Sequence, residues 1–186
     1  IEQWMKTSEQ QAQENINTLL GGTSIADLIM SILIVGVMTG FAEEILFRGA
    51  LLKIIATANK KVNIHFAIWT TAFLFSAIHM QFYGFFPRLL LGAFFGYLLW
   101  WSGSLWLPII AHSINNIITV IFTWLTQKGI IALDPNTFGA TDDTTIMAVT
   151  SLIVTAIAIV ALHKFIVRSN QISCGGTQTH DQDTSL

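Results

Sequence analysis

Two adjacent glutamates, Glu43 and Glu44, stand in an otherwise apolar stretch and are followed by Arg48. A charged side chain at membrane depth is costly unless it is paired or lines a wet cavity. Glu44 and Arg48 are four residues apart and face each other along a helix, whereas Glu43 points about 100° away. One carboxylate held ionised beside another that is free to exchange a proton suits acid–base chemistry. The alternative is a structural ion pair that locks two helices.

Three more polar residues lie in apolar segments. His79 ends one segment, and an interfacial hydrogen bond is the alternative to a catalytic role. His112 and Asn116 are four residues apart and share one helix face, so they could bind a substrate carbonyl, a metal or a water. Interhelical hydrogen bonding, worth about 0.6–2 kcal/mol in membranes, is the alternative for this pair. Asn115 is predicted to point elsewhere. No catalytic role is predicted for the remaining histidines, which are His65, His163 and His180.

The composition is that of a membrane protein. Of the 186 residues, 53% are hydrophobic and 11% are charged, and the mean hydropathy is +0.62. Soluble domains carry roughly 25% charged residues. A formal net charge of -2 argues against a nucleic-acid partner. The single cysteine, Cys174, excludes a disulfide framework. Because the chain begins with Ile1 and not with Met, we expect it to be a piece of a longer protein. Its first residues do not form a signal-peptide pattern.

The elements that must position these side chains are helices, because only helices or closed barrels satisfy the backbone in lipid. The apolar runs are too long and uniform for barrel strands. We predict an all-α, multi-pass transmembrane bundle of about five spans, preceded by a polar surface segment at 1–24 and followed by a disordered tail at 167–186. The spans are predicted at about 25–58, 64–80, 88–102, 105–126 and 145–166.

Two features of these spans call for explanation. The first span would be about 50 Å long, against a ~30 Å hydrocarbon core, so a kink near Gly36 or Gly40 or emergence near Lys53 is expected. Gly92 and Gly96 are predicted to allow close helix packing. Lys and Arg bias places the C-terminus in the cytoplasm, since one side holds Lys53, Lys60, Lys61, Lys164 and Arg168, against Lys6, Arg88 and Lys128.

The depth of the polar groups raises a difficulty for this topology. Glu44 and His79 reach similar depths about the turn at 59–63. His112, however, lies only eight residues beyond Ser104, about 12 Å from that face. The groups therefore converge only if the turn at 102–107 dips inward or the helices tilt strongly.

The polar groups resemble the motifs of the CPBP family of intramembrane proteases, the CAAX-protease and bacteriocin-processing group. The family pattern Glu-Glu-x-x-x-Arg corresponds to Glu43, Glu44 and Arg48. Its Phe-x-x-x-His motif corresponds to Phe75 and His79, and its His-x-x-x-Asn motif to the pair in 112–116. The resemblance covers roughly 39–120 and implies that 25–166 forms a CPBP-like protease domain. Members generally have more than five spans, which fits an N-terminal truncation.

The resemblance implies peptide-bond hydrolysis in a membrane. The expected partners are the bilayer and a peptide or lipidated protein substrate. Substrates would be of the CAAX type or bacteriocin precursors, in a bacterial cell membrane. In the metal-free scheme Glu43, assisted by His79, polarises the water, and Glu44, held by Arg48, supports the site. Donors to the scissile carbonyl oxygen would come from His112 and Asn116.

A zinc scheme is the alternative, with His79, His112 and either Glu43 or Glu44 as ligands. The His-Glu-x-x-His zinc signature is absent, and the sequence leaves no cofactor and zinc both open. Two other classes of function remain as alternatives. A proton-coupled transporter also uses intramembrane Glu, His and Arg, and an immunity protein would bind a partner without cutting it.

Overall fold

The structure is a computed structural model that describes residues 2–22, 24–58, 62–82, 84–131, 157, 159–166 and 168. Contacts divide the chain into two units, Ile1–Ile131 and Ala132–Leu186. All of the predicted polar site lies in the first unit. The predicted fifth span at 145–166 falls largely outside the described residues, as does the predicted tail at 167–186.

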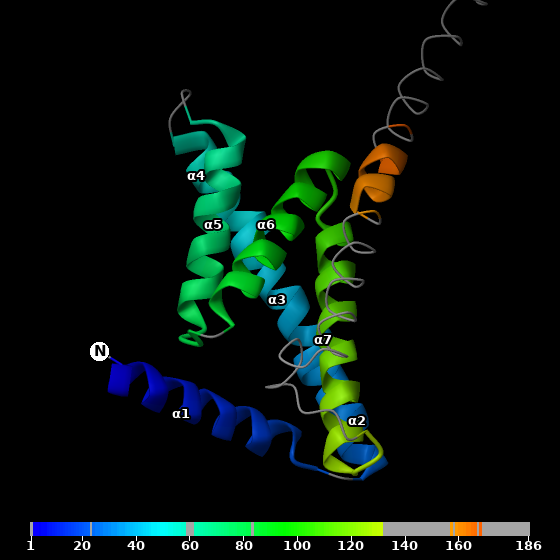
Figure 1. The fold of residues 1–186 in the computed structure, drawn as a ribbon. Helices are drawn as coiled ribbons and strands as arrows, with labels where there is room; N and C mark the ends of the chain where they lie inside the picture. Colours follow the sequence, from blue (N-terminus) through cyan, green and yellow to red (C-terminus); the bar gives the residue numbers. More distant parts are fainter. Residues whose placement is uncertain are drawn as a thin grey trace, which may run out of the picture. The chain divides into compact units, whose positions relative to one another are not determined.

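The first unit is helical, and its described residues contain no strand (Figure 1). Two helices are long and apolar enough to cross a membrane, Ile25–Ala58 and Trp106–Gln127, and a third apolar helix is shorter. A helical membrane protein is therefore supported, while five spans and a cytoplasmic C-terminus stay predictions. In chain order the elements are α1 (Glu2–Leu20), α2 (Ile25–Ser31), η1 (Ile32–Thr39), α3 (Gly40–Glu44), η2 (Ile45–Leu51), α4 (Leu52–Ala58), α5 (Ile64–Ile78), α6 (Phe85–Ser102) and α7 (Trp106–Gln127).

The elements α2 to α4 form one continuous helix that carries both glutamates. It begins with a capping box, in which Asp27 N–H donates to Ser24 Oγ and Ser24 N–H donates to the Asp27 carboxylate. The short α-helical piece α3 lies between two π-helical stretches, η1 and η2. Wide π turns are rare and often mark functional sites. The backbone stays helical at Gly40, with φ −57° and ψ −41°.

Gly36 and Gly40 of this helix allow close packing against α7. A Cβ at Gly36 would lie 2.7 Å from Ile117 Cγ1, and one at Gly40 would lie 2.9 Å from Ser113 Oγ. Gly36 contacts Ile117, whereas Gly40, later in its helix, contacts the earlier residue Ser113 of α7. The two helices therefore run antiparallel. Their close approach brings the backbone that carries Glu44 against the backbone that carries His112.

We expect Gly40→Ala to destabilise the protein. The added Cβ would lie 3.1 Å from the Ser113 backbone nitrogen as well as against Oγ, so the helices must separate. Overpacking of this kind costs about 1–3 kcal/mol, against a gain of about 1 kcal/mol in helix propensity. The measurement is the midpoint of thermal unfolding in detergent micelles. Gly49→Ala is the matched control, because its nearest contact is an ordinary 3.4 Å; equal midpoints for the two variants would contradict the expectation.

The helices α5 and α6 pack through the glycines predicted for this purpose. A Cβ at Gly92 would lie 3.1 Å from Phe75 Cδ1, and one at Gly96 would lie 2.8 Å from Ile68 Cγ2. Close packing at both glycines is thus confirmed. The core beneath them is formed by Leu52, Ala67, Ile68, Ala72 and Ala93.

The start of α6 differs from the prediction. The helix begins at Phe85, three residues before the predicted start, so Pro87 lies in its first turn instead of in the connector. Proline is tolerated there, because the first N–H groups of a helix have no intrahelical partner. Ser76 Oγ donates to the Phe85 carbonyl at 2.7 Å and ties this end of α6 to α5.

The position of the turn between α6 and α7 explains how His112 reaches the level of Glu44. Gly103 closes α6 in the left-handed conformation, with φ 67°. Leu105 then lies beside Gly49, because a Cβ on that glycine would be 3.4 Å from Leu105 Cδ2. Glu44 precedes Gly49 by about 7.5 Å of helix, and His112 follows Leu105 by about 10.5 Å. The turn therefore lies well inside the end of α4, as the first of the two options required.

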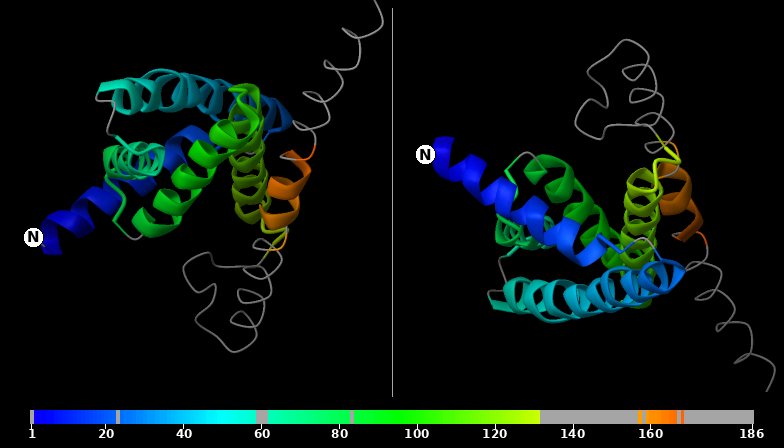
Figure 2. Two further views of the ribbon diagram at one scale, coloured as in Figure 1. Left: turned by 90° about the horizontal axis from the view of Figure 1, so that it is seen from above. Right: turned by 90° about the horizontal axis from the view of Figure 1, so that it is seen from below.

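The polar N-terminal segment forms the helix α1, which lies across the end of the bundle where α5 turns toward α6 (Figure 2). Phe82 of that connection donates its N–H to Glu9 Oε2 at 2.9 Å. Its ring packs edge-on against Trp4, with centroids 5.2 Å apart. These contacts fix α1 to the connection between α5 and α6.

Candidate active site

Glu44 is the buried centre of the polar cluster. Its side chain is 0% exposed, and Arg48 is 1% exposed. Arg48 Nη1 donates to Glu44 Oε1 at 2.7 Å, as the spacing of four predicted. His112 Nδ1 lies 2.8 Å from the same oxygen. Arg48 and His112 thus meet at the same carboxylate oxygen, and Glu44 sets the orientation of the His112 ring.

Aromatic rings enclose this charged group. The His112 ring is stacked on Phe95, with centroids 4.8 Å apart and planes at 24°. The Arg48 guanidinium carbon lies 4.9 Å from the Phe75 centroid and 5.4 Å from that of Phe95. Arg48 Nη2 also donates to the Gly92 carbonyl at 2.7 Å. The guanidinium is thereby tied to α6 as well as to its own helix, which makes it a fixed counter-ion for Glu44.

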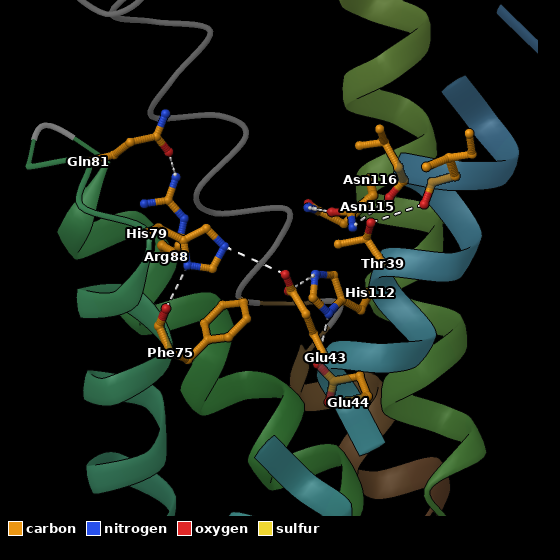
Figure 3. A network of polar contacts seen from close by, with 12 residues as sticks. Thr39, Glu43, Glu44, Phe75, His79, Gln81, Arg88, His112, Asn115 and Asn116 are labelled. Atoms are coloured by element: carbon orange, nitrogen blue, oxygen red, sulfur yellow. Dashed lines mark hydrogen bonds and ion pairs between the residues drawn. The ribbon is translucent and has the colours of Figure 1, made fainter. Parts of the chain in front are cut away.

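Glu43 faces a different environment, between two imidazole rings (Figure 3). Its Oε2 lies 3.6 Å from His112 Nε2, and its Oε1 lies 3.9 Å from His79 Nε2. The side chain is 25% exposed. His79 Nδ1 lies 2.7 Å from the Phe75 carbonyl and must donate to it, because a carbonyl only accepts. That bond turns Nε2 of His79 toward Glu43.

Both distances from Glu43 to the rings exceed a direct hydrogen bond. A water about 2.8 Å from each partner can bridge heavy atoms that are this far apart. The arrangement therefore has the means to hold and deprotonate a water, with a carboxylate as base and an imidazole on either side.

Asn116 lines the same site, but part of its hydrogen-bonding capacity is used within the protein. Its Nδ2 donates to the Val35 carbonyl at 3.3 Å, and Asn115 Nδ2 donates to its Oδ1 at 3.4 Å. The prediction that Asn115 points elsewhere is wrong. Four residues of α7 with the spacing i, i+3, i+4 and i+7 line the cavity, so they share one face of the helix. They are His112, Asn115, Asn116 and Thr119.

These side chains line a cavity of about 290 Å³. Its wall contains Leu20, Val35, Thr39, Glu43, Phe75, His79, Arg88, Leu91, His112, Asn115, Asn116, Thr119 and Val120. From the sequence, Arg88 is predicted only to be one of the charges that set the orientation of the chain in the membrane. Its neighbours are all apolar in the first turns of α6, and an arginine in such surroundings was the available signal for a role at the site.

The zinc alternative needs three protein ligands around one point. Among the described residues, no group of three or more His, Cys, Asp or Glu side chains is arranged to hold a metal ion. Nδ1 of His112 is committed to Glu44, and Nδ1 of His79 to a backbone carbonyl. Nε2 of each ring faces Glu43 and has no short hydrogen bond, and bonds of this kind at Nδ1 are also those of histidines that ligate a metal. The mechanism proposed below is written without a metal.

Comparison with known families identifies a family for the segment that carries this site. A family model described as "Type II CAAX prenyl endopeptidase Rce1-like" matches residues 25–118, about half of the chain. The matched segment begins where α2 begins and includes the glutamate pair, Arg48, His79, His112 and Asn116. No curated protein and no solved structure matches the chain.

Proposed function

Because this chain belongs to the Rce1-like family of type II CAAX prenyl endopeptidases, we propose that it hydrolyses a peptide bond of a membrane-associated or lipidated peptide, with Glu43 as the general base. The family supports an intramembrane protease in general terms. The finer proposal rests on one observation, which is the position of the Glu43 carboxylate between the rings of His79 and His112 at the cavity wall.

The first step is attack by water on the scissile carbonyl carbon. Glu43 accepts a proton from the water as its oxygen bonds to that carbon. His79, with Nδ1 tied to the Phe75 carbonyl, supports this carboxylate from the other side. Glu44 is unsuited to the role of base, because it is fully buried and already accepts two hydrogen bonds.

The second step needs donors for the negative oxygen of the tetrahedral intermediate. In this scheme His112 donates to that oxygen from Nε2, which faces the cavity beside Glu43 while Nδ1 is held by Glu44. Asn116 keeps one amide N–H beyond the one given to Val35. Glu43 then returns the proton to the leaving amine as the carbon–nitrogen bond breaks.

The test is cleavage by the purified protein in liposomes. Two substrates are offered, a farnesylated peptide that ends in a CAAX sequence and a bacteriocin-type leader peptide, and products are identified by mass spectrometry. Cleavage of either supports hydrolysis and names the substrate class. If neither is cut while the protein dissipates a proton gradient, a transporter replaces the protease.

We expect cleavage to survive metal chelation, because no three donor side chains among the described residues are arranged to hold a metal ion and Glu43 serves as base without a Lewis acid. The measurement is the initial rate before and after dialysis against 1,10-phenanthroline, with metal content determined on the same samples. Thermolysin-type zinc peptidase added to the same liposomes is the positive control for chelation. Loss of activity that stoichiometric zinc restores would contradict the metal-free mechanism.

A further inference from the structure

Arg88 is the charged residue of the cavity wall to which the proposed mechanism gives no role. It lies near the start of α6 and its side chain is half-buried at the cavity, beside His79 (Figure 3). Nη2 donates to Gln81 Oε1. Nη1 is buried and has no hydrogen-bond partner among the described residues. One edge of the guanidinium is thus fixed and another donor is left unused.

The position of this guanidinium is prepared by the surrounding chain. It folds back over Gly84, where a Cβ would lie 3.3 Å from Nη2, so the absence of a side chain there makes room for it. Gln81 is neutral, so its hydrogen bond holds the Arg88 guanidinium in place without neutralising the charge. Phe82 N–H donates to Oε2 of Glu9, the nearby acid of α1.

The charge of Arg88 is not matched by an ion pair. Arg48 has Glu44 as its counter-ion, whereas no carboxylate lies within salt-bridge distance of Arg88 in the part of the chain that the structure describes. Glu9 and Glu43 interact with Arg88 electrostatically from beyond that distance, and the buried Nη1 donor stays available to an anion from outside. The planar fork of arginine matches a carboxylate with two parallel hydrogen bonds.

We propose that Arg88 binds the free C-terminal carboxylate of the substrate. This inference rests on the proposed peptidase function and adds a rule for where the enzyme cuts. Arg88 and Glu43 line one small cavity, and three extended residues span at most about 10 Å. A carboxylate held by Arg88 therefore limits hydrolysis to bonds within a few residues of the C-terminus. An internal peptide segment, or a C-terminal amide, lacks the charge that completes the site.

The experiment compares two farnesylated peptides that differ only in a C-terminal acid or amide. For the wild-type protein in liposomes we expect kcat/KM for the acid to exceed that for the amide by about 10- to 100-fold, the range of one charged hydrogen-bonded contact. In Arg88→Gln the ratio should fall to about one. Arg88→Lys should give an intermediate ratio, because it keeps the charge without the fork. Lys53→Gln, which removes an exposed cation outside the cavity, should keep the wild-type ratio.

The possible outcomes distinguish a failure of the Arg88 assignment from a failure of the proposed peptidase function. If the wild type cuts acid and amide equally, Arg88 does not read the carboxylate, although the peptidase function stands. A preference that persists in Arg88→Gln likewise overturns the assignment and points to another group. Failure of the wild type to cut either peptide would count against the proposed function itself. The wild-type ratio decides the matter even if Arg88→Gln does not fold.

Discussion

Replacement of Glu43 by glutamine should lower the rate of peptide hydrolysis by about 10²–10⁴-fold, the usual contribution of a general acid–base group. The amide has nearly the same shape, so it can fill the same place between His79 and His112. It cannot accept the proton of the water, and the first step loses its base. Because the side chain is partly exposed and forms no short ion pair, the fold should tolerate the change.

The measurement is kcat for the cleaved peptide, together with the unfolding midpoint of the same preparation. Glu14→Gln is the matched control, since it makes the same chemical change at an exposed position of α1 and should leave kcat unchanged. Wild-type kcat in Glu43→Gln would remove Glu43 from the role of base. A lowered kcat accompanied by a lowered midpoint would instead assign this residue to structure.

Arg48→Met should give the largest loss of stability, about 3–5 kcal/mol, the usual cost of removing one partner from a buried ion pair. Methionine keeps much of the length of the side chain but leaves Glu44 charged and fully buried. His112 is then the remaining donor to that carboxylate. The hydrogen bond to the Gly92 carbonyl is lost as well, which loosens α6 from the long helix.

Unfolding of the variant in mixed detergent micelles measures this cost. Lys6→Met is the control, because Lys6 also pairs with a glutamate four residues away, but on an exposed surface, and such pairs contribute about 0–1 kcal/mol. The double variant Glu44→Gln, Arg48→Met should recover part of the loss, since it removes the unpaired charge. An Arg48→Met protein as stable as wild type would contradict a stabilising role for this ion pair.

The local features of this protein follow from the sequence. The glutamate pair and Arg48 could be assigned from spacing, because residues four apart on a helix meet whatever surrounds them. The apolar runs predicted helices that agree within about three residues with those at Ile25–Ala58, Ile64–Ile78, Phe85–Ser102 and Trp106–Gln127. The family resemblance rested on three short motifs and is confirmed by the family match.

What only the tertiary structure decided depends on distant parts of the chain. The bond from His112 to Glu44 joins residues 68 positions apart, and it forms because Leu105 lies beside Gly49 instead of at the end of α4. The positions of Asn115 and Arg88 on the cavity wall likewise depend on how the helices are rotated and offset. Periodicity fixes which residues share a face, but the depth at which two faces meet is set by packing, and that packing completes the site around Glu43.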